Sequence, residues 1–293
     1  MGIAFERVVM VMMENSTRDN VLNNGYMSAL RKQGVFLSNS HGVTHPSQPN
    51  YIVSISGDTF GFINDDNGWA TRIQDDDPNQ PPITTIVDLL EAQGLSWKSY
   101  AEDLLDSDRI ACPAKPPYPE IPDDHFPFAR KHVPFLCFPS VASNPDRMAK
   151  VVNASEFETD LAAGNLPTYS WYTPNLINCG HSLSSTKNRN HPLTEDAPKN
   201  VDNVASFLQG FLGSDPIAKF PAETLIVITW DEAYPYSADY GVYTLLIGDM
   251  LEAGTTNSEP SNHYTMLRSM EVNFGLGCLN RNDASAQPMW FLR

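Results

Sequence analysis

Residues 5–15 read FERVVMVMMEN, and the run Val8–Met13 contains no polar side chain. A strand that is apolar on both faces belongs inside a parallel sheet that is covered on both sides. Residues 224–232, TLIVITWDE, follow the same pattern. Each run stops at a pair of oxygen-bearing side chains, Glu14-Asn15 in the first and Asp231-Glu232 in the second. The two stretches predict a mostly parallel sheet with polar groups where its central strands end.

Apolar runs alternate with amphipathic stretches along the rest of the chain, which is the pattern of an α/β fold. The segment at about 103–144 is rich in proline and aromatic residues and is interpreted as a long loop or a lid insertion. The expected strands are Phe5–Met13, Val35–Ser38, Ser96–Tyr100, Thr168–Tyr172, Leu225–Trp230 and Gly241–Ile247. The expected helices are Asp19–Lys32, Ser47–Ser56, Thr84–Gln93, Glu156–Ala163, Val201–Leu212 and Asn262–Phe274.

The charge balance narrows the classes of partner. The 293 residues include 35 acidic and 19 basic side chains, for a formal net charge of −16. A field of that sign repels polyanions, so we expect no nucleic-acid partner, and a phosphorylated substrate would need local positive charge such as a metal ion. No apolar run reaches the roughly 18 residues of a membrane span. Because the N-terminus lacks the basic flank of a signal peptide, we expect a cytoplasmic protein, or a secreted one if a leader is missing from this sequence.

Two weaker patterns leave alternatives open. The four cysteines show no CxxC spacing, which argues against a structural zinc site. Cys112 and Cys137 would pair in an oxidising compartment, and unpaired thiols are an equal alternative. The acidic loops Asp65–Asp66 and Asp75–Asp77 lack the ligand spacing of an EF-hand, so solvated loop charge is the better interpretation.

The two polar pairs at the strand ends are candidates for a metal site. In open α/β sheets, function gathers at the carboxyl ends of the strands, where Glu14-Asn15 and Asp231-Glu232 are placed. An unpaired carboxylate is costly to bury there, and hard divalent cations prefer such oxygen ligands. The alternative is helix capping by Glu14 or Asn15 and a turn at Asp231. Two such pairs in one chain favour the metal.

Residues 42–57, GVTHPSQPNYIVSISG, place Ser47 between two prolines just before an apolar run. A helix that begins there would present free N–H groups and a dipole that favour an anion. A hydroxyl at that position, next to a cation, is a candidate nucleophile for a phosphoryl group. Asn50 is then placed to direct its amide at a phosphate oxygen. The alternative is that Ser47 is a plain N-cap.

The histidines divide by position. His181 follows the strand expected at Thr168–Tyr172, His45 lies two residues from Ser47, and His263 opens the last helix, so these three are candidates for catalysis. We interpret the others named here as ordinary surface or hydrogen-bonded residues: His41, His125 and His191.

Seven blocks of sequence, taken in order, resemble the phosphoesterase family of metal-dependent acid phosphatases and bacterial phospholipases C, in the alkaline-phosphatase-like superfamily. They are MMENST, HPSQPNYIVSISGDTFG, ITTIVDLLEAQGLSWKSYAE, ARKHVPF, LPTYSWYTPNLINCGH, LIVITWDEA and HYTMLRSMEVNFGLGCL. The shorter acid-phosphatase branch fits better than the phospholipases. The resemblance implies a single domain over residues 1–293, folded as a three-layer α/β/α sandwich with a mostly parallel central sheet.

The resemblance also implies a site and a mechanism. Ser47 would attack phosphorus in line, and water would release phosphate from the phosphoserine. The metal and His181 would stabilise the equatorial oxygens, while His45 or His263 would protonate the leaving alkoxide. The implied ligands of one divalent metal ion (Mg, Ca, Mn or Zn) are Glu14, Asn15, Ser47, Asp231 and Glu232. The expected substrate contacts are Asn50, Asn15 and Asn178.

Two departures from the family pattern bear on activity. Cys179 stands where the family commonly has the Asp of Asn-Asp-Gly-His, and the segment after Glu232 has tyrosines where many bacterial members have a His. We expect a phosphomonoesterase that acts on a small phosphorylated substrate. The alternatives are a phospholipase C-type phosphodiesterase and a repurposed member that binds phosphorylated ligands with little turnover, which Cys179 would favour. The sequence sets neither the identity of the metal nor the oligomeric state.

Overall fold

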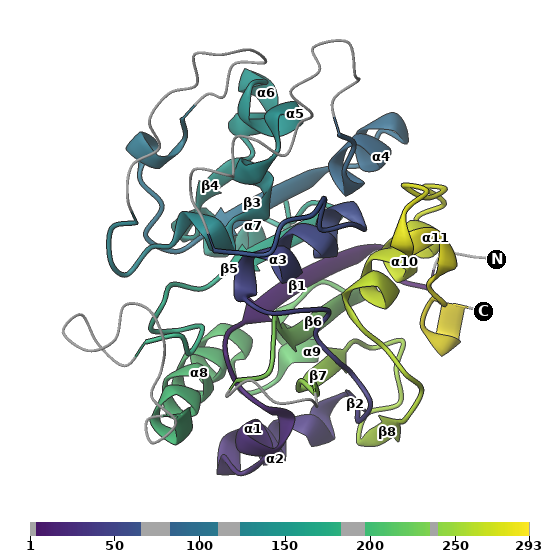
Figure 1. The fold of residues 1–293 in the computed structure, drawn as a ribbon. Helices are drawn as coiled ribbons and strands as arrows, with labels where there is room; N and C mark the ends of the chain where they lie inside the picture. The colour runs from purple at the N-terminus through teal and green to yellow at the C-terminus, as the bar shows by residue number, and fades with distance from the viewer. Residues whose placement is uncertain (1–3, 66–82, 111–123, 183–196, 235–239, 293) are drawn as a thin grey trace.

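The computed structural model describes residues 4–65, 83–110, 124–182, 197–234 and 240–292 (Figure 1). Within these ranges, eight strands form one sheet in the order β4-β3-β5-β1-β6-β7-β2-β8. At its centre, β1 (Arg7–Met13) and β6 (Thr224–Trp230) pair in parallel along seven positions. Strand β7 runs antiparallel to both of its neighbours, and the other pairs are parallel. The mostly parallel sheet is therefore confirmed.

The other strands are shorter than the central two. They are β2 (Val35–Leu37), β3 (Trp97–Ala101), β4 (Val151–Asn153), β5 (Tyr169–Thr173), β7 (Thr244–Ile247) and β8 (Thr255–Asn257). The sequence did not predict β4 and β8, because three residues are too few to show the alternation of a strand. Strand β7 begins later than predicted, since Gly241 forms only an isolated bridge with His41.

The helices are α1 (Arg18–Leu22), α2 (Gly25–Leu30), α3 (Ser47–Ser56), α4 (Ile86–Ala92), α5 (Pro139–Ala142), α6 (Pro145–Met148), α7 (Ser155–Ala162), α8 (Ala197–Leu212), α9 (Pro216–Lys219), α10 (His263–Asn273) and α11 (Asn282–Ser285). The single helix predicted over Asp19–Lys32 was wrong. The Asn24 side chain accepts a hydrogen bond from the Met27 N–H at 3.1 Å, so it caps a new helix and divides the segment into α1 and α2. Helix α3 has the predicted bounds.

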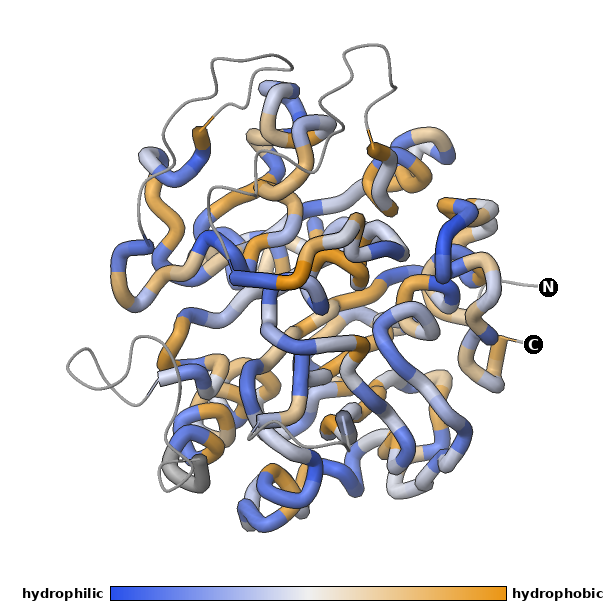
Figure 2. Tube along the Cα trace, in the orientation of Figure 1, coloured by the Kyte–Doolittle hydropathy of each residue, from blue (hydrophilic) through white to orange (hydrophobic). Residues whose placement is uncertain are grey.

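The alternating side chains of β1 build two core layers. Val8, Met10 and Met12 belong to one apolar cluster, which includes residues of α3, α4 and α10. Val9, Val11 and Met13 belong to the other, which includes residues of α1, α2, α7 and α8. Figure 2 shows apolar stretches toward the centre of the molecule and hydrophilic ones around it. Helices thus cover both faces of the sheet, and the expected three-layer α/β/α sandwich is confirmed.

The described part of the Pro-rich segment packs into the core. Residues 133 and 135–138 are fully buried, and Phe135 stacks on Trp97. Residues 124–144 of the predicted loop or lid insertion are thus an ordered segment packed against the core, and residues 111–123 lie outside the described ranges. Cys137 is a free, buried thiol, while Cys112 also lies outside those ranges. No helix within the described residues is long and apolar enough to cross a membrane.

Candidate active site

The Glu14-Asn15 and Asp231-Glu232 pairs lie side by side because β1 and β6 end in register, with Met13 opposite Trp230. The Asn15 N–H donates to Asp231 Oδ1 at 3.1 Å, and the Asp231 N–H donates to the Met13 carbonyl at 2.9 Å. Asn15 has a φ of 53°, in the left-handed region that few residues other than glycine adopt. The structure thus brings together the two pairs that the sequence singled out.

Ser47 is the first residue of α3, and its hydroxyl faces both pairs. Its Oγ lies 3.0 Å from Glu14 Oε2 and 3.1 Å from Glu232 Oε1. The N-cap position belongs to Pro46, and no side chain caps the helix from it. The alternative interpretation of Ser47 as a plain N-cap is therefore wrong. Pro49 fits the first turn of the helix because it has no N–H to leave unpaired.

Asn50, one turn along α3, holds the segment that leads to Ser47. Its Oδ1 accepts from the N–H groups of Val43 and Thr44, at 2.9 and 3.1 Å. Its Nδ2 donates to the carbonyls of Thr44 and Pro46, at 2.8 and 3.1 Å. These four bonds give Asn50 a positioning role, and its contact with substrate stays a prediction.

Asn178 and Asn15, the other two asparagines expected to contact substrate, also have partners in the chain. The Asn178 Nδ2 donates to Glu102 Oε2 at 2.8 Å. The Asn15 Nδ2 donates to Glu14 Oε2 at 2.7 Å. The buried Asn15 Oδ1 has no hydrogen-bond partner within the described residues, so Asn15 keeps one atom for a ligand.

His45 and His263 both contact the Asp231-Glu232 pair. His45 Nδ1 contacts Glu232 Oε2, and its ring stacks on Tyr240 with centroids 4.6 Å apart. Tyr240 is one of the tyrosines that replace the downstream His of the family. His263 Nε2 donates to the backbone carbonyl of Asp231 at 2.7 Å, so the structure gives it a supporting contact behind the carboxylates. Its burial lowers its pKa to about 4.

His181 lies in the loop after β5, and that loop is fastened to the end of β1. The Glu14 N–H donates to the Cys179 carbonyl at 2.9 Å. The Cys179 side chain belongs to the apolar cluster on the α8 side of the sheet. His181 Nδ1 lies 3.1 Å from Ser182 Oγ, and burial lowers the pKa of His181 to about 3. The ring is therefore neutral at ordinary pH and acts as a hydrogen-bonding group without a charge.

Two site residues were not predicted: Lys131 and His132, from the 3₁₀-helix Arg130–His132. His132 Nε2 lies 2.9 Å from Glu14 Oε1, and its ring stacks on Tyr51 and lies 5.8 Å from that of His181. Lys131 Nζ donates to Asp65 Oδ2 at 2.7 Å. The block ARKHVPF carried the signal, since three consecutive basic side chains are unusual in so acidic a chain.

Some of the other acidic and histidine residues considered in the sequence lie within the described ranges and some lie outside them. Asp65 is exposed, as predicted for a loop charge, but its carboxylate also accepts from the Gln48 N–H at 2.9 Å and from Lys131. Residues 66 and 75–77 lie outside the described ranges, as does His191. His125 pairs with Asp108 at 2.8 Å, which confirms its ordinary hydrogen-bonded role.

The electrostatics of the site are those of crowded, buried carboxylates. Burial, and then the charges of Glu14 and Glu232, raise the pKa of Asp231 well above its ordinary value. Burial raises the pKa of Glu232 to about 7, although its bond to His45 opposes the rise. Burial also opposes the ionisation of Glu14, but His132, together with the smaller effects of His181 and Lys131, outweighs it and lowers the pKa to about 2. A nearby cation would stabilise all three carboxylates in their charged form.

The donor atoms fit a hard divalent cation. Asp231 Oδ2, like Asn15 Oδ1, is buried without a hydrogen-bond partner among the described residues. Orphaned oxygens of this kind destabilise a protein unless they bind something, and they are the ligands such cations prefer. Among the described residues, no group of three or more His, Cys, Asp and Glu side chains is arranged to hold a metal ion without other ligands. The predicted ligand set differs from such a group because it also includes the amide oxygen of Asn15 and the hydroxyl oxygen of Ser47. In the structure, one carboxylate oxygen of Glu14 and one of Glu232 lie against the Ser47 hydroxyl.

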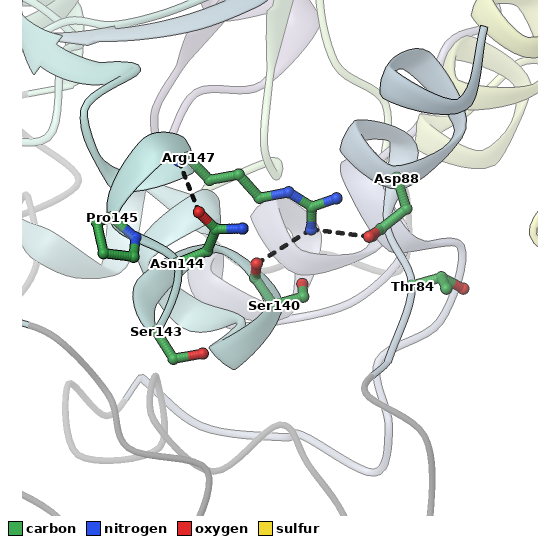
Figure 3. A pocket seen from close by; sticks show the side chains of 7 residues that line it. All are labelled: Thr84, Asp88, Ser140, Ser143, Asn144, Pro145 and Arg147. Atoms are coloured by element: carbon green, nitrogen blue, oxygen red, sulfur yellow. Dashed lines mark hydrogen bonds and ion pairs between the residues drawn. The ribbon is translucent and has the colours of Figure 1, made fainter.

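A separate pocket lies against α5 and α6 (Figure 3). Its lining residues are Thr84, Asp88, Ser140, Ser143, Asn144, Pro145 and Arg147. The Arg147 guanidinium is held by Asp88 Oδ1 at 2.8 Å and by the Ser140 carbonyl at 3.0 Å. Because none of the predicted site residues lines this pocket, it plays no part in the site around Ser47.

The sequence profile of the Phosphoesterase family matches residues 23–277. The chain belongs to the phosphoesterase family. An acid phosphatase of Aspergillus fumigatus is 30% identical over 298 residues, which cover 97% of this chain and 58% of that protein. A phosphate-repressible acid phosphatase of Penicillium chrysogenum is 31% identical, over 97% of this chain and 63% of that protein. A phosphatidylinositol-3-phosphatase of Mycobacterium tuberculosis is 28% identical, over 93% and 78%.

Solved structures share the fold at much lower identity. A protein in the alkaline phosphatase superfamily from Vibrio parahaemolyticus aligns with a TM-score of 0.55 and 11% identity, over 97% of this chain and 70% of that one. The lipoteichoic acid synthase LtaP from Listeria monocytogenes aligns with a TM-score of 0.56 and 10% identity, over 93% and 75%. These likenesses show that this member of the phosphoesterase family has the alkaline-phosphatase-like fold.

Proposed function

We propose that this phosphoesterase hydrolyses phosphate monoesters with Ser47 as its nucleophile. The observation that carries the proposal is the Ser47 hydroxyl, which lies at the N-terminus of α3 within 3.1 Å of two buried carboxylates. A helix N-terminus favours an anion, and the carboxyl edge of the sheet is where α/β proteins bind ligands. The relatives named above are phosphatases by name, which supports the same class of substrate.

We propose that Glu14, Asn15, Ser47, Asp231 and Glu232 together hold one divalent cation. The crowded carboxylates and the two orphaned oxygens support this donor set. When bound, such an ion is a Lewis acid that lowers the pKa of a neighbouring hydroxyl and offsets charge on a phosphate.

The chain's own residues supply orientation and proton transfer. Asn50 fixes the approach to Ser47, whose Oγ attacks phosphorus in line to give a phosphoserine that water then hydrolyses. The neutral His181 ring donates a hydrogen bond to a phosphate oxygen without adding charge. His45 is the proton donor to the leaving alkoxide, because its side chain is 17% exposed and contacts Glu232, whereas His263 Nε2 is bound to the Asp231 carbonyl.

The rival functions are phospholipase C-type diester hydrolysis and ligand binding with little turnover. Cys179 gives little support to ligand binding without turnover, because its thiol lies in the apolar cluster and not among the site residues. Ser47 and the four strand-end residues remain together. Monoester hydrolysis therefore has the stronger support.

The test compares a generic aryl phosphate with choline phospholipids, with and without a chelator. We expect turnover of the aryl phosphate that the chelator removes and an added divalent metal restores. Turnover confined to phospholipids would favour the diesterase. If no ester is hydrolysed with any divalent metal between acidic and neutral pH, the enzyme proposal is wrong.

A further inference from the structure

Asp65 lies against the N-terminus of α3, beside the proposed nucleophile. Its Oδ1 accepts from the N–H of Gln48 at 2.9 Å, and Gln48 directly follows Ser47. Its Oδ2 accepts from Lys131 Nζ at 2.7 Å. One carboxylate therefore receives a helix N-terminal amide and an ammonium at the same time.

An amide at a helix N-terminus and a lysine ammonium are the two kinds of group that bind a phosphate. Lys131 directly precedes His132, whose Nε2 lies 2.9 Å from Glu14 Oε1, so it belongs to the 3₁₀-helix that reaches the site. Burial opposes the charge on Lys131, but Asp65 outweighs burial, and with Glu14 and Asp124 it raises the pKa of Lys131. Lys131 is thus a positive charge held by Asp65, whose other oxygen bonds the residue after Ser47.

The pair lies where a ligand can reach it. The Lys131 side chain is 16% exposed and that of Asp65 is 25% exposed. A carboxylate carries one negative charge, as does a phosphodiester, whereas an ionised phosphomonoester carries up to two. Because Coulomb attraction scales with charge, only the monoester has an advantage over Asp65 in the competition for the ammonium.

We propose that Asp65 and Lys131 form a specificity pair, in which Asp65 is an internal anion that yields Lys131 to the phosphate of a dianionic monoester and not to that of a diester. The inference deepens the proposed function and rests on it for the place of the phosphate beside Ser47. Lys131 is then a substrate-binding residue, and Asp65 acts through it.

Asp65→Asn is the variant that separates charge from structure. Asparagine keeps the oxygen that accepts from Gln48, so the cap on α3 is retained while the charge that holds Lys131 is removed. Asp160→Asn is the matched control, because Asp160 also accepts from a lysine, Lys98, at 2.7 Å, but joins β3 to α7. Lys131→Met and Lys131→Arg remove and keep the ammonium's charge, respectively.

The probe is inorganic phosphate, with its dissociation constant measured by calorimetry and its inhibition constant by kinetics, in one buffer and with one divalent salt throughout. We expect Asp65→Asn to bind phosphate about tenfold more tightly and to leave the monoester-to-diester ratio of kcat/KM no lower than in the wild type, because the dianion gains at least as much as the monoanion once no carboxylate competes for Lys131. Lys131→Met should weaken phosphate binding about tenfold, lower the monoester-to-diester ratio of kcat/KM, and abolish the effect of Asp65→Asn in the double variant. Lys131→Arg should retain more phosphate affinity than Lys131→Met, because it keeps the positive charge, and Asp160→Asn should stay within about threefold of the wild type.

Phosphate affinity that matches the wild type in Asp65→Asn or in Lys131→Met, or a monoester-to-diester ratio that Lys131→Met leaves unchanged, would overturn the specificity pair. The two proposals fail separately, because calorimetry needs no turnover. Active wild-type enzyme with unchanged phosphate binding in Asp65→Asn refutes the pair alone. Wild-type protein that turns over no ester, with tightened phosphate binding in Asp65→Asn, refutes the proposed function and supports the anion-binding role of the pair. If Asp65→Asn does not fold, the contrast between Lys131→Met and Lys131→Arg decides the role of the ammonium.

Discussion

Glu271→Gln tests how the C-terminal segment is held against the rest of the fold. Glu271 is a fully buried residue of α10, and its carboxylate lies 3.1 Å from Arg268 Nη1. The Leu279 N–H bonds to Glu271 Oε1 at 3.3 Å and to Asp283 Oδ2 at 2.7 Å, so the two carboxyl groups share a donor. Burial, and then the charge of Asp283, raise the pKa of Glu271 to about 7, although Arg268 opposes the rise.

The shift sets both the sign and the size of the effect. From an ordinary value of 4.5, the rise to about 7 means that the folded state keeps the proton over a range in which the unfolded state has lost it. The stabilisation is complete below the ordinary pKa and is lost as the pH rises through the folded value. At about 1.4 kcal/mol per pKa unit, the loss is about 3 kcal/mol between acidic and slightly alkaline pH. Glutamine has no such proton, so the variant lacks this part of the slope.

The assay is urea unfolding of the wild type and Glu271→Gln from about pH 4.5 to about pH 8. As the pH rises across this range, the free energy of unfolding of the wild type should fall by about 3 kcal/mol more than that of the variant. The exposed Glu252→Gln serves as the control for loss of one negative charge. A difference between Glu271→Gln and the wild type that stays constant with pH would refute the reasoning.

Three further predictions concern the proposed site. Ser47→Ala should lower kcat by about a thousandfold or more while changing the free energy of unfolding by less than about 1 kcal/mol, because the hydroxyl does not cap α3; substantial turnover in a clean preparation would mean that another residue is the nucleophile. Glu14→Gln should reduce the metal content of dialysed protein, measured by elemental analysis, and full stoichiometric metal would exclude Glu14 as a ligand. His45→Asn should slow hydrolysis of alkyl phosphates about a hundredfold more than that of aryl phosphates with good leaving groups; equal losses would assign His45 a role other than proton donation.

The sequence predicted the centre of the sheet better than its edges. The apolar runs of β1 and β6 are unbroken because both faces of each strand are buried, so each strand was recognisable alone. Strands β4 and β8 have three residues each, and tertiary pairing decides their conformation. The break between α1 and α2 depends on one capping asparagine, which a helical pattern does not reveal.

The site was predictable where it follows from topology. Parallel strands that end in register must bring their next residues together, and this placed Glu14 beside Asp231. His132 and Lys131 come from a short 3₁₀-helix that the Pro-rich segment folds back onto the site, and no local pattern predicts that path. The contacts of Asp65 were not predicted because a loop carboxylate looks the same in sequence whether it faces water or a helix end 17 residues away.

The amide of Asn50 leaves position 50 with no tolerance for a different side chain. An amide offers two donor hydrogens and two acceptor lone pairs, and its four bonds to residues 43–46 use them all. Aspartate would lose both donors, and glutamine would move the group by one methylene. Ser47 is therefore aimed before any substrate arrives, by a residue that need not touch the substrate. Redesign of the substrate range is best directed to Lys131, whose side chain can change without removing the hydrogen bonds that orient the segment before Ser47.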